Sequence, residues 1–383
     1  MLFRTTSEVR NSSPSGVVHY GSGASRHSGG PSVIESFPFI VGWELTLTCN
    51  LRCTHCGSSA GQARAQELTT EEALAICEQL PALLVQEVDF TGGEPLLRPD
   101  WPIIARRLIE LGIPTNILTN GLQVGAETVE QMREVGISGV GISLDGLEET
   151  HDAVRNCKGS FAAVLQSILL MQAAHLPLNV ITTVNALNLP ELPGLLTLLR
   201  SLGVRYWRLQ PIIPMGRVRS HTELQIDKRD ILKIGNFVRE HMRGKAGEEV
   251  QIICSDGLEY VDKTAESERP WRGCSAGIVS CGITSDGKVK GCLSMPDELV
   301  EGDLRRSSLW DIWFHPDSFP YTRHFSCDQL GPNCRTCDKE EECKGGCSSS
   351  SYCSTGHFHN DPYCFYKASA AEASDPTSES SYP

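Results

Sequence analysis

The sequence predicts an α/β protein with a parallel β-sheet, followed by a loop-rich region that is dense in cysteine. Two observations support this fold class. Six apolar, strand-like runs alternate with helical patterns between about residues 39 and 218, at intervals of roughly 25–40 residues. After about Glu223 the alternation stops, and cysteines crowd the segment from Gly273 to Cys364. Six strand–helix units are fewer than the eight of a closed barrel, so an open, partial barrel and a doubly wound sheet both fit.

The strands are expected at 39–48, 85–91, 115–120, 139–145, 178–184 and 204–212. Between them, one helix begins after Thr69 with Glu72 three residues on, which is the capping-box pattern. A second helix contains ETVEQMREV and ends at Gly136, and a third begins after Ser160. In either parallel fold, the functional site is expected at the carboxyl ends of the strands.

The composition excludes several classes of protein. Of the 383 residues, 40% are hydrophobic and 21% are charged, a balance that excludes disorder throughout the chain. A net charge of −13 argues against a nucleic-acid partner. The N-terminus lacks the apolar region of a secretory signal, and no apolar run reaches the roughly 18 residues of a membrane span. We therefore expect a soluble, cytoplasmic protein.

The same patterning suggests where the domains begin and end. Residues 1–37 are rich in Ser, Gly, Arg and His and are expected to form a flexible tail. The strand–helix core is expected over 38–225, a helical linker over 226–270, the cysteine-rich domain over 271–366 and a second flexible tail over 367–383.

Three cysteines, Cys49, Cys53 and Cys56, come directly after the first strand. Three thiolates this close can hold three irons of a [4Fe–4S] cube, which leaves the fourth iron without a protein ligand. An open coordination position is the usual mark of chemistry at a metal centre. The alternative is a zinc site completed by His55 or by a distant cysteine.

These residues carry a family resemblance. CNLRCTHC resembles the cluster motif of radical S-adenosylmethionine (SAM) enzymes, and TGGEP at 91–95 resembles their GGEP motif. The resemblance covers about 39–218 and implies a partial (β/α)6 TIM-like barrel. It implies that the open iron chelates SAM, while the backbone of Gly92 and Gly93, with Glu94, receives the methionine ammonium. Four more positions resemble SAM-contacting residues of the family, with turn residues and a surface salt bridge as the alternative: Asn120, Ser143, Asp145 and Arg155.

The C-terminal cysteines form a second pattern, and their eight thiols suffice for two clusters with four ligands each. The spacing resembles that of the SPASM domain of radical SAM maturases over about 271–366. By family analogy, the first auxiliary [4Fe–4S] cluster takes Cys274, Cys281, Cys292 and Cys347. The second takes Cys334, Cys337, Cys343 and Cys364. Zinc is the alternative for the CxxC half, and without Cys281 the first auxiliary cluster would have an open iron.

Five cysteines are left over. Cys77 falls inside an amphipathic helix and is expected to be buried packing. The other four could include a thiol that donates a hydrogen atom to a substrate radical, although the inert interpretation is favoured for each: Cys157, Cys254, Cys327 and Cys353.

The resemblance implies reductive cleavage of SAM to a 5′-deoxyadenosyl radical, which abstracts hydrogen from a substrate. Two auxiliary clusters suit removal of a second electron, giving oxidation or a cross-link, whereas a spare thiol would give epimerisation. The leading expectation is a maturase of a ribosomally made peptide, reduced by a low-potential donor such as flavodoxin or ferredoxin. The alternatives are an oxidoreductase for a small molecule in cofactor or tetrapyrrole biosynthesis, and a non-catalytic iron–sulfur or zinc-binding scaffold.

Overall fold

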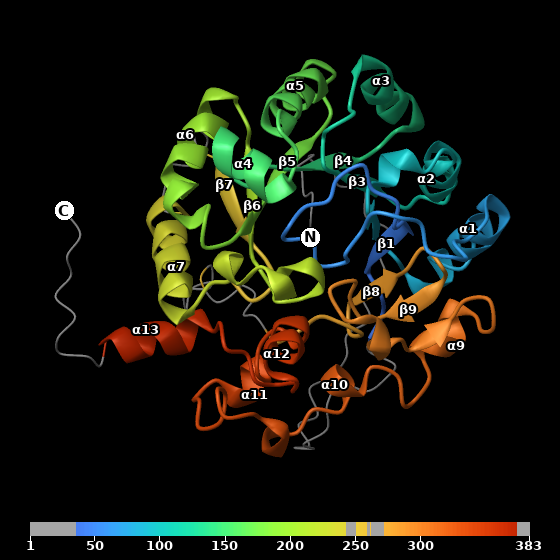
Figure 1. Ribbon diagram of the computed structural model, residues 1–383. Coiled ribbons are helices and arrows are strands. Elements are labelled where there is room, and N and C mark those ends of the chain that lie inside the picture. Colours follow the sequence, from blue (N-terminus) through green and yellow to red (C-terminus); the bar gives the residue numbers. More distant parts are fainter. Residues whose placement is uncertain (1–35, 243–249, 259–260, 262–271, 374–383) are drawn as a thin grey trace, which may run out of the picture.

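The computed structural model describes residues 36–242, 250–258, 261 and 272–373. Its centre is a sheet of ten strands in the order β10-β9-β8-β1-β2-β3-β4-β5-β6-β7. Strands β1 to β7 pair in parallel, each with the next along the chain. The sheet curves into an incomplete barrel with helices around its outer side (Figure 1). The parallel α/β fold with a partial barrel is therefore confirmed.

All six expected strands are present: β1 (Ile40–Thr46), β2 (Glu87–Gly92), β3 (Thr115–Thr119), β4 (Gly139–Ser143), β5 (Leu178–Val184) and β6 (Tyr206–Pro211). Side chains alternate along them, as the period of two requires. Trp43 and Phe90 face the helices and pack edge to face, with ring centroids 6.1 Å apart. Their neighbours Glu44 and Thr91 line a cavity inside the barrel instead.

Seven helices belong to the barrel: α1 (Thr70–Cys77), α2 (Trp101–Glu110), α3 (Ala126–Val135), α4 (Glu148–Arg155), α5 (Ser160–Ala173), α6 (Leu192–Ser201) and α7 (Lys228–Met242). The expected capping box is present at α1, where Glu72 N–H donates to Thr69 Oγ1 at 3.2 Å and Thr69 N–H donates to Glu72 Oε2 at 2.9 Å. Gly136 ends α3 with a φ of 90°, a left-handed conformation that glycine adopts without steric cost. None of the described helices is long and apolar enough to cross a membrane.

The barrel extends further than the sequence predicted. Strand β7 (Gln251–Cys254) lies in the expected linker and pairs in parallel with β6. Helix α7 and β7 therefore add a seventh helix–strand unit. A strand of four residues is too short to show a clear alternation, which explains why the sequence pattern did not reveal it.

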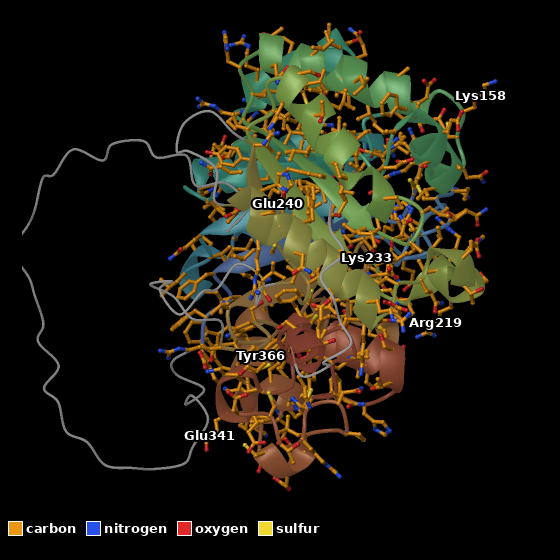
Figure 2. The ribbon with its side chains drawn as sticks, turned by 90° about the vertical axis from the view of Figure 1, so that its left-hand side faces the viewer. Lys158, Arg219, Lys233, Glu240, Glu341 and Tyr366 are labelled. Atoms are coloured by element: carbon orange, nitrogen blue, oxygen red, sulfur yellow. The ribbon has the colours of Figure 1, made fainter. Side chains whose placement is uncertain are left out.

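The C-terminal domain is built from short elements: β8 (Ser280–Ile283), β9 (Lys288–Lys290), β10 (Gly302–Asp303), α9 (Leu309–Trp313), α10 (Pro320–Arg323), α11 (Glu340–Cys343), α12 (Ser348–Thr355) and α13 (Phe365–Ala373). Strand β8 pairs in parallel with β1, so this domain continues the barrel sheet. Helix α13 covers residues that were expected in the C-terminal tail. It packs on α7, where Arg239 lies over the Phe365 ring at 4.4 Å, and the two helices adjoin in Figure 2.

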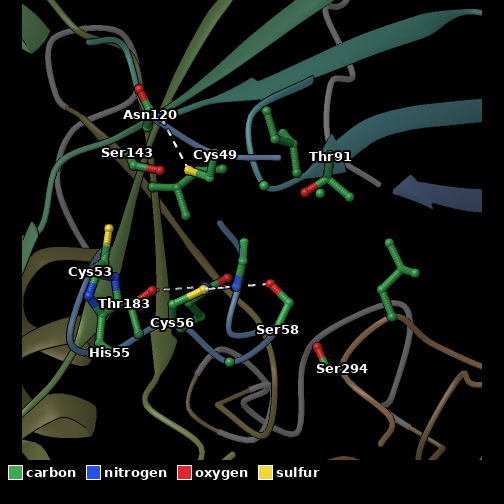
Figure 3. A pocket seen from close by; sticks show the side chains of 18 of the residues that line it. Cys49, Cys53, His55, Cys56, Ser58, Thr91, Asn120, Ser143, Thr183 and Ser294 are labelled. Atoms are coloured by element: carbon green, nitrogen blue, oxygen red, sulfur yellow. Dashed lines mark hydrogen bonds between the residues drawn. The ribbon is translucent and has the colours of Figure 1, made fainter. Parts of the chain in front are cut away.

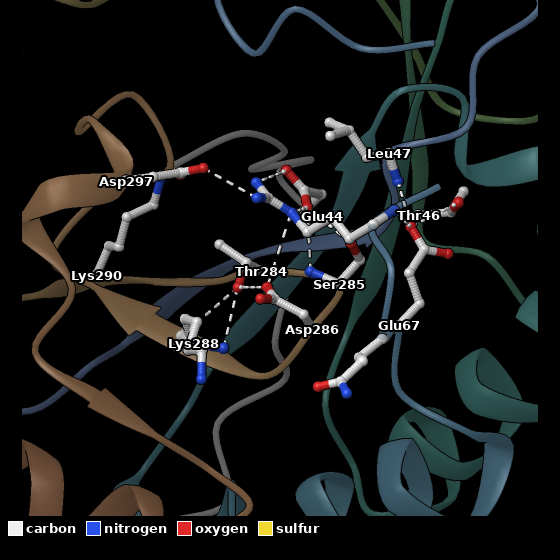
Figure 4. Close-up of polar contacts among 12 residues, drawn as sticks. Glu44, Thr46, Leu47, Glu67, Thr284, Ser285, Asp286, Lys288, Lys290 and Asp297 are labelled. Carbon is white, nitrogen blue, oxygen red and sulfur yellow. Dashed lines mark hydrogen bonds and ion pairs between the residues drawn. The ribbon is translucent and has the colours of Figure 1, made fainter. Parts of the chain in front are cut away.

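A buried polar network also joins the two domains (Figure 4). Glu44 on β1 accepts hydrogen bonds from the backbone N–H of Ser285 at 3.1 Å and from its hydroxyl at 2.8 Å. Arg64 binds Glu44 at 2.7 Å and Asp297 at 2.9 Å. The strand that leads into the three-cysteine loop is thus fixed to the cysteine-rich domain.

Candidate active site

A cavity of about 330 Å³ lies at the carboxyl ends of the barrel strands, where parallel α/β folds place their sites. Cys49, Cys53 and Cys56 line it together, and Figure 3 shows their side chains around the space. All three belong to the loop after β1. Arg208 and Gln210 from β6 also line the cavity, together with apolar residues that include Ile212 and Met215.

The three-cysteine loop is held from two sides. Thr54 N–H donates to the carbonyl of Val154 on α4 at 2.9 Å. Arg217, which follows β6, donates from Nε to the Cys53 carbonyl and from Nη1 to the Ala60 carbonyl, each at 2.8 Å. Arg217 could not be selected from the sequence, because no motif surrounds it. Its guanidinium fixes the loop backbone without touching a sulfur.

Each of the three sulfurs has a nearby N–H donor, as expected around metal-bound thiolates. Leu51 N–H lies 3.4 Å from the Cys49 sulfur, and Ala60 N–H lies 3.3 Å from that of Cys56. Arg155 Nη1 lies 3.9 Å from the Cys53 sulfur. Burial raises the pKa of Cys53, while the Arg155 charge opposes this shift.

The cavity that the three cysteines share bears on the choice between zinc and a cluster of irons. Thiolates on one zinc ion, each bound at about 2.3 Å, lie about 4 Å apart. Among the described residues, no three His, Cys, Asp or Glu side chains form a group able to hold a single metal ion. Three sulfurs that share a larger cavity fit a cube of irons better, since each iron needs only one of them.

A buried ion-pair cluster fixes the loop to β4. The Asp145 carboxylate has no exposed surface and contacts His55 Nε2 at 3.1 Å and Arg155 Nη2 at 2.5 Å. Its other oxygen accepts from Thr183 N–H at 2.8 Å. Although burial alone would raise the pKa of Asp145, the charges of Arg155 and His55 hold it well below its usual range. Asp145 therefore anchors two residues of the site.

Five of the seven expected SAM-binding residues line the cavity: Gly92, Gly93, Asn120, Ser143 and Arg155. Glu94 and Asp145 do not. The Glu94 carboxylate accepts hydrogen bonds from Thr119 Oγ1 at 2.9 Å and from Asn120 N–H at 2.8 Å, so it holds the end of β3. The Glu94 carboxylate is thus already hydrogen-bonded within the protein. Contacts of SAM with the five residues that line the cavity stay a prediction.

The two glycines are required by the backbone alone. A Cβ on Gly93 would lie 2.2 Å from the Thr48 carbonyl oxygen, and a Cβ on Gly92 would lie 2.2 Å from that of Thr46. We expect Gly93→Ala to lower the free energy of unfolding by about 3 kcal/mol, because two backbones must separate. Urea unfolding under anaerobic conditions measures this. Gly125→Ala, where no atom lies within 4 Å of the added Cβ, is the control and should cost under about 1 kcal/mol. Equal effects would contradict the explanation.

Glu94 should make stability depend on pH. Complete burial raises its pKa from 4.5 to about 7 despite its hydrogen bonds. The folded state then binds the Glu94 proton more tightly than the unfolded state does. The contribution of this proton to the free energy of unfolding is therefore complete below about pH 4.5 and is lost as the pH rises through about 7. Wild type should lose stability relative to Glu94→Gln, on the order of 3 kcal/mol, between about pH 5 and pH 8 in urea unfolding. A pH-independent difference between wild type and Glu94→Gln would refute the assignment.

A second, smaller cavity of about 70 Å³ lies in the C-terminal domain. Cys274, Cys292 and Cys347 line it together with Asp256, which also lines the larger cavity. Cys281, the other thiol assigned to the first auxiliary cluster by family analogy, does not line it. Instead Cys281 lies on β8 with 2% of its surface exposed, within the hydrophobic core.

The four cysteines assigned to the second auxiliary cluster lie in the last part of the described chain. Burial raises the pKa of Cys364 to about 12, with the Cys343 charge contributing, and that of Cys334 to about 11, with the Cys364 charge contributing. The Tyr366 hydroxyl, which donates to Asp338 at 2.7 Å, also lies within electrostatic reach of Cys337 and Cys364. The structure thus brings these four thiols into one neighbourhood.

The remaining cysteines lie away from the larger cavity. Cys77 has no exposed surface and packs in the core, as expected. None of the four candidate hydrogen donors lines the cavity in the described chain: Cys157, Cys254, Cys327 and Cys353. Arg208 and Asp256 do line it and were missed by sequence reasoning. The sequence signal for Arg208 was its place in the expected strand over 204–212, whereas Asp256 lies beyond β7, a strand that the sequence did not reveal.

An incomplete parallel barrel with three thiols at its mouth, joined to a cysteine-rich domain, defines a class of iron–sulfur enzymes whose chemistry occurs at the barrel mouth. Family models match the chain in the same two places: the Radical SAM superfamily over residues 43–199, and SPASM, an iron-sulfur cluster-binding domain, over residues 274–338. The chain belongs to the radical SAM superfamily and carries a SPASM domain.

Relatives extend this similarity over nearly the whole chain. An AdoMet-dependent heme synthase of Methanosarcina barkeri is 31% identical over 86% of this chain and 97% of its own length. A PqqA peptide cyclase of Granulibacter bethesdensis is 28% identical over 84% of this chain and 85% of its own length. The crystal structure of Streptococcus suis SuiB bound to S-adenosylmethionine shares the fold, with a TM-score of 0.69 at 17% identity, over 86% of this chain and 76% of SuiB.

Proposed function

We propose that this protein is an oxidising radical SAM enzyme with three [4Fe–4S] clusters, one that binds SAM and two auxiliary. The observation that carries this is the convergence of Cys49, Cys53 and Cys56 on one cavity at the barrel mouth. When bound, the first cluster and SAM would supply a 5′-deoxyadenosyl radical after one-electron reduction by a flavodoxin or ferredoxin.

The chain's own residues would bind SAM and orient the substrate. Gly92 and Gly93 would present backbone to the methionine end of SAM, and Ser143 and Asn120 offer hydrogen-bonding side chains at neighbouring strand ends. Asp145, which does not itself line the cavity, holds Arg155 and His55 in place through ion pairs. The apolar residues of the cavity wall would exclude water, which protects a reactive radical from side reactions.

For the substrate we propose a carboxylate-bearing small molecule of the tetrapyrrole class. The AdoMet-dependent heme synthase supports this choice, because the match to it extends over 97% of that protein's length. A feature of the cavity supports this choice: Arg208 lines it, and its buried Nε has no hydrogen-bond partner among the described residues. An unpartnered guanidinium N–H suits a propionate, because arginine binds carboxylates through charge-assisted hydrogen bonds.

A ribosomally made peptide remains the second candidate, to be cross-linked, oxidised or epimerised. It is supported by the peptide cyclase relative, which matches over 84% of this chain. Anaerobic turnover with SAM and reductant separates the two. We expect an iron porphyrin with propionate side chains to be oxidatively decarboxylated with stoichiometric 5′-deoxyadenosine, as seen by mass spectrometry. Modification of a co-encoded peptide, with the porphyrin unchanged, would establish the second candidate instead.

A further inference from the structure

The 70 Å³ cavity of the C-terminal domain holds an unexpected set of ligands. It is lined by three cysteines assigned to the first auxiliary cluster, Cys274, Cys292 and Cys347, and by the carboxylate residue Asp256. A [4Fe–4S] cube has four irons and so offers a fourth corner to a protein ligand. The question is which side chain occupies that corner.

Asp256 is fixed in this position by a tight turn after β7. Ser255 N–H donates to the Leu209 carbonyl at 3.1 Å, and Leu258 N–H donates back to the Ser255 carbonyl at 3.3 Å. Asp256 itself has a φ of 55°, a left-handed conformation that is uncommon outside glycine and clusters at functional sites. The turn lies against Cys347, since a Cβ on Gly257 would be 3.8 Å from the Cys347 Cβ.

Asp256 lines the 70 Å³ cavity beside the three cysteines. Arg208 is the charged group that acts on its carboxylate. A carboxylate that lines the same cavity as Cys274, Cys292 and Cys347 is placed as a fourth ligand would be.

Cys281 lies on the face of β8 that packs in the hydrophobic core, and it does not line the 70 Å³ cavity. In the parallel register of β8 with β1, Cys281 is paired with Val41, whose side chain is in the hydrophobic core. The next residue, Gly282, is the one that approaches the cluster segment: a Cβ there would lie 2.9 Å from the carbonyl carbon of Cys292. Because side chains alternate along a strand, Cys281 points away from the cavity that Cys292 lines.

We propose that Asp256, and not Cys281, is the fourth protein ligand of the first auxiliary cluster. The inference rests on the auxiliary cluster proposed above but is independent of the substrate. An oxygen ligand is harder than a thiolate and is less favoured by iron–sulfur clusters, so this corner would be the most exchangeable of the four. Asp256 also lines the larger cavity, so the exchangeable corner faces the space where the substrate would bind.

Three variants of the full-length, anaerobically reconstituted protein test this: Asp256→Ala, Asp256→Cys and Cys281→Ala. We expect Cys281→Ala to keep about twelve irons per chain and the wild-type electron paramagnetic resonance (EPR) spectrum of the dithionite-reduced state. Asp256→Ala should change the signal of one cluster and raise its midpoint potential, since an anionic ligand is lost. Asp256→Cys should retain the iron and so show that the fold tolerates substitution there.

Labelling gives a direct readout on the unmodified chain. With carboxyl-¹³C aspartate incorporated, pulsed EPR should detect a ¹³C hyperfine coupling in wild type and in Cys281→Ala, and no coupling in Asp256→Cys. A wild-type spectrum without this coupling would overturn the proposal. So would a loss of about four irons in Cys281→Ala with an unchanged Asp256→Ala spectrum. Wild type that holds only the SAM-binding cluster would overturn both this ligand and the auxiliary cluster it belongs to.

Discussion

Replacing Cys53 by alanine should abolish 5′-deoxyadenosine formation and lower the iron content from about twelve to about eight per chain. Cys53 is one of the three thiols that line the cavity at the barrel mouth, and it is the most buried of them. Arg155 Nη1 lies 3.9 Å from its sulfur. Two thiols cannot hold a cube of four irons firmly. Iron analysis and chromatographic detection of 5′-deoxyadenosine, after addition of dithionite and SAM, measure both effects.

Cys327→Ala is the matched control, because Cys327 is exposed and lines neither cavity. It should keep the full iron content and the wild-type rate. Retention of SAM cleavage in the Cys53 variant would contradict the assignment of the cluster to this loop. A loss of about eight irons or more would show that the two domains depend on each other for cluster assembly.

Replacing Asp145 by alanine should be the most destabilising single change in the barrel, at about 3–5 kcal/mol. Asp145 is fully buried and pairs with both Arg155 and His55, so its removal leaves a buried guanidinium without a partner. The same change frees the three-cysteine loop, because His55 lies between Cys53 and Cys56. We therefore also expect the variant to lose the iron of the first cluster faster than wild type in the presence of a chelator.

The control for this prediction is an exposed ion pair. Glu130 pairs with Arg133 on α3, where both side chains are more than half exposed, and Glu130→Gln should cost under about 1 kcal/mol. The midpoint of anaerobic urea unfolding compares the two variants. If Asp145→Ala unfolded at the wild-type midpoint, the buried pair would not be what holds the loop to β4.

The sequence was sufficient for the barrel because its strands carry strong signals. Long apolar runs separated by capped helices predict parallel pairing, and β1 to β6 appear where they were expected. Strand β7 was missed because its four residues are too few to show a period. Helix α13 was missed because its Ala- and Ser-rich sequence resembles a tail, while contact with α7 stabilises it.

The candidate site could be predicted only where residues share a motif. Cys49, Cys53 and Cys56 are close in sequence, so their convergence was foreseeable. Arg208 lies on β6 and Asp256 in the turn after β7, and only the folded barrel brings them to the same cavity. Glu94 and Cys281 do not line the cavities to which they were assigned. The direction of a side chain decides this, and the spacing of motif residues along the chain does not determine that direction.

The most direct test of the account is whether SAM binds at an open iron of the cluster held by Cys49, Cys53 and Cys56. The reduced, reconstituted protein should show a change in its EPR spectrum on addition of SAM, with hyperfine coupling to ¹⁵N in the amino group of labelled SAM. The same spectrum should be absent when all three cysteines are replaced by alanine. A wild-type spectrum that is unaffected by SAM and shows no ¹⁵N coupling would contradict the account.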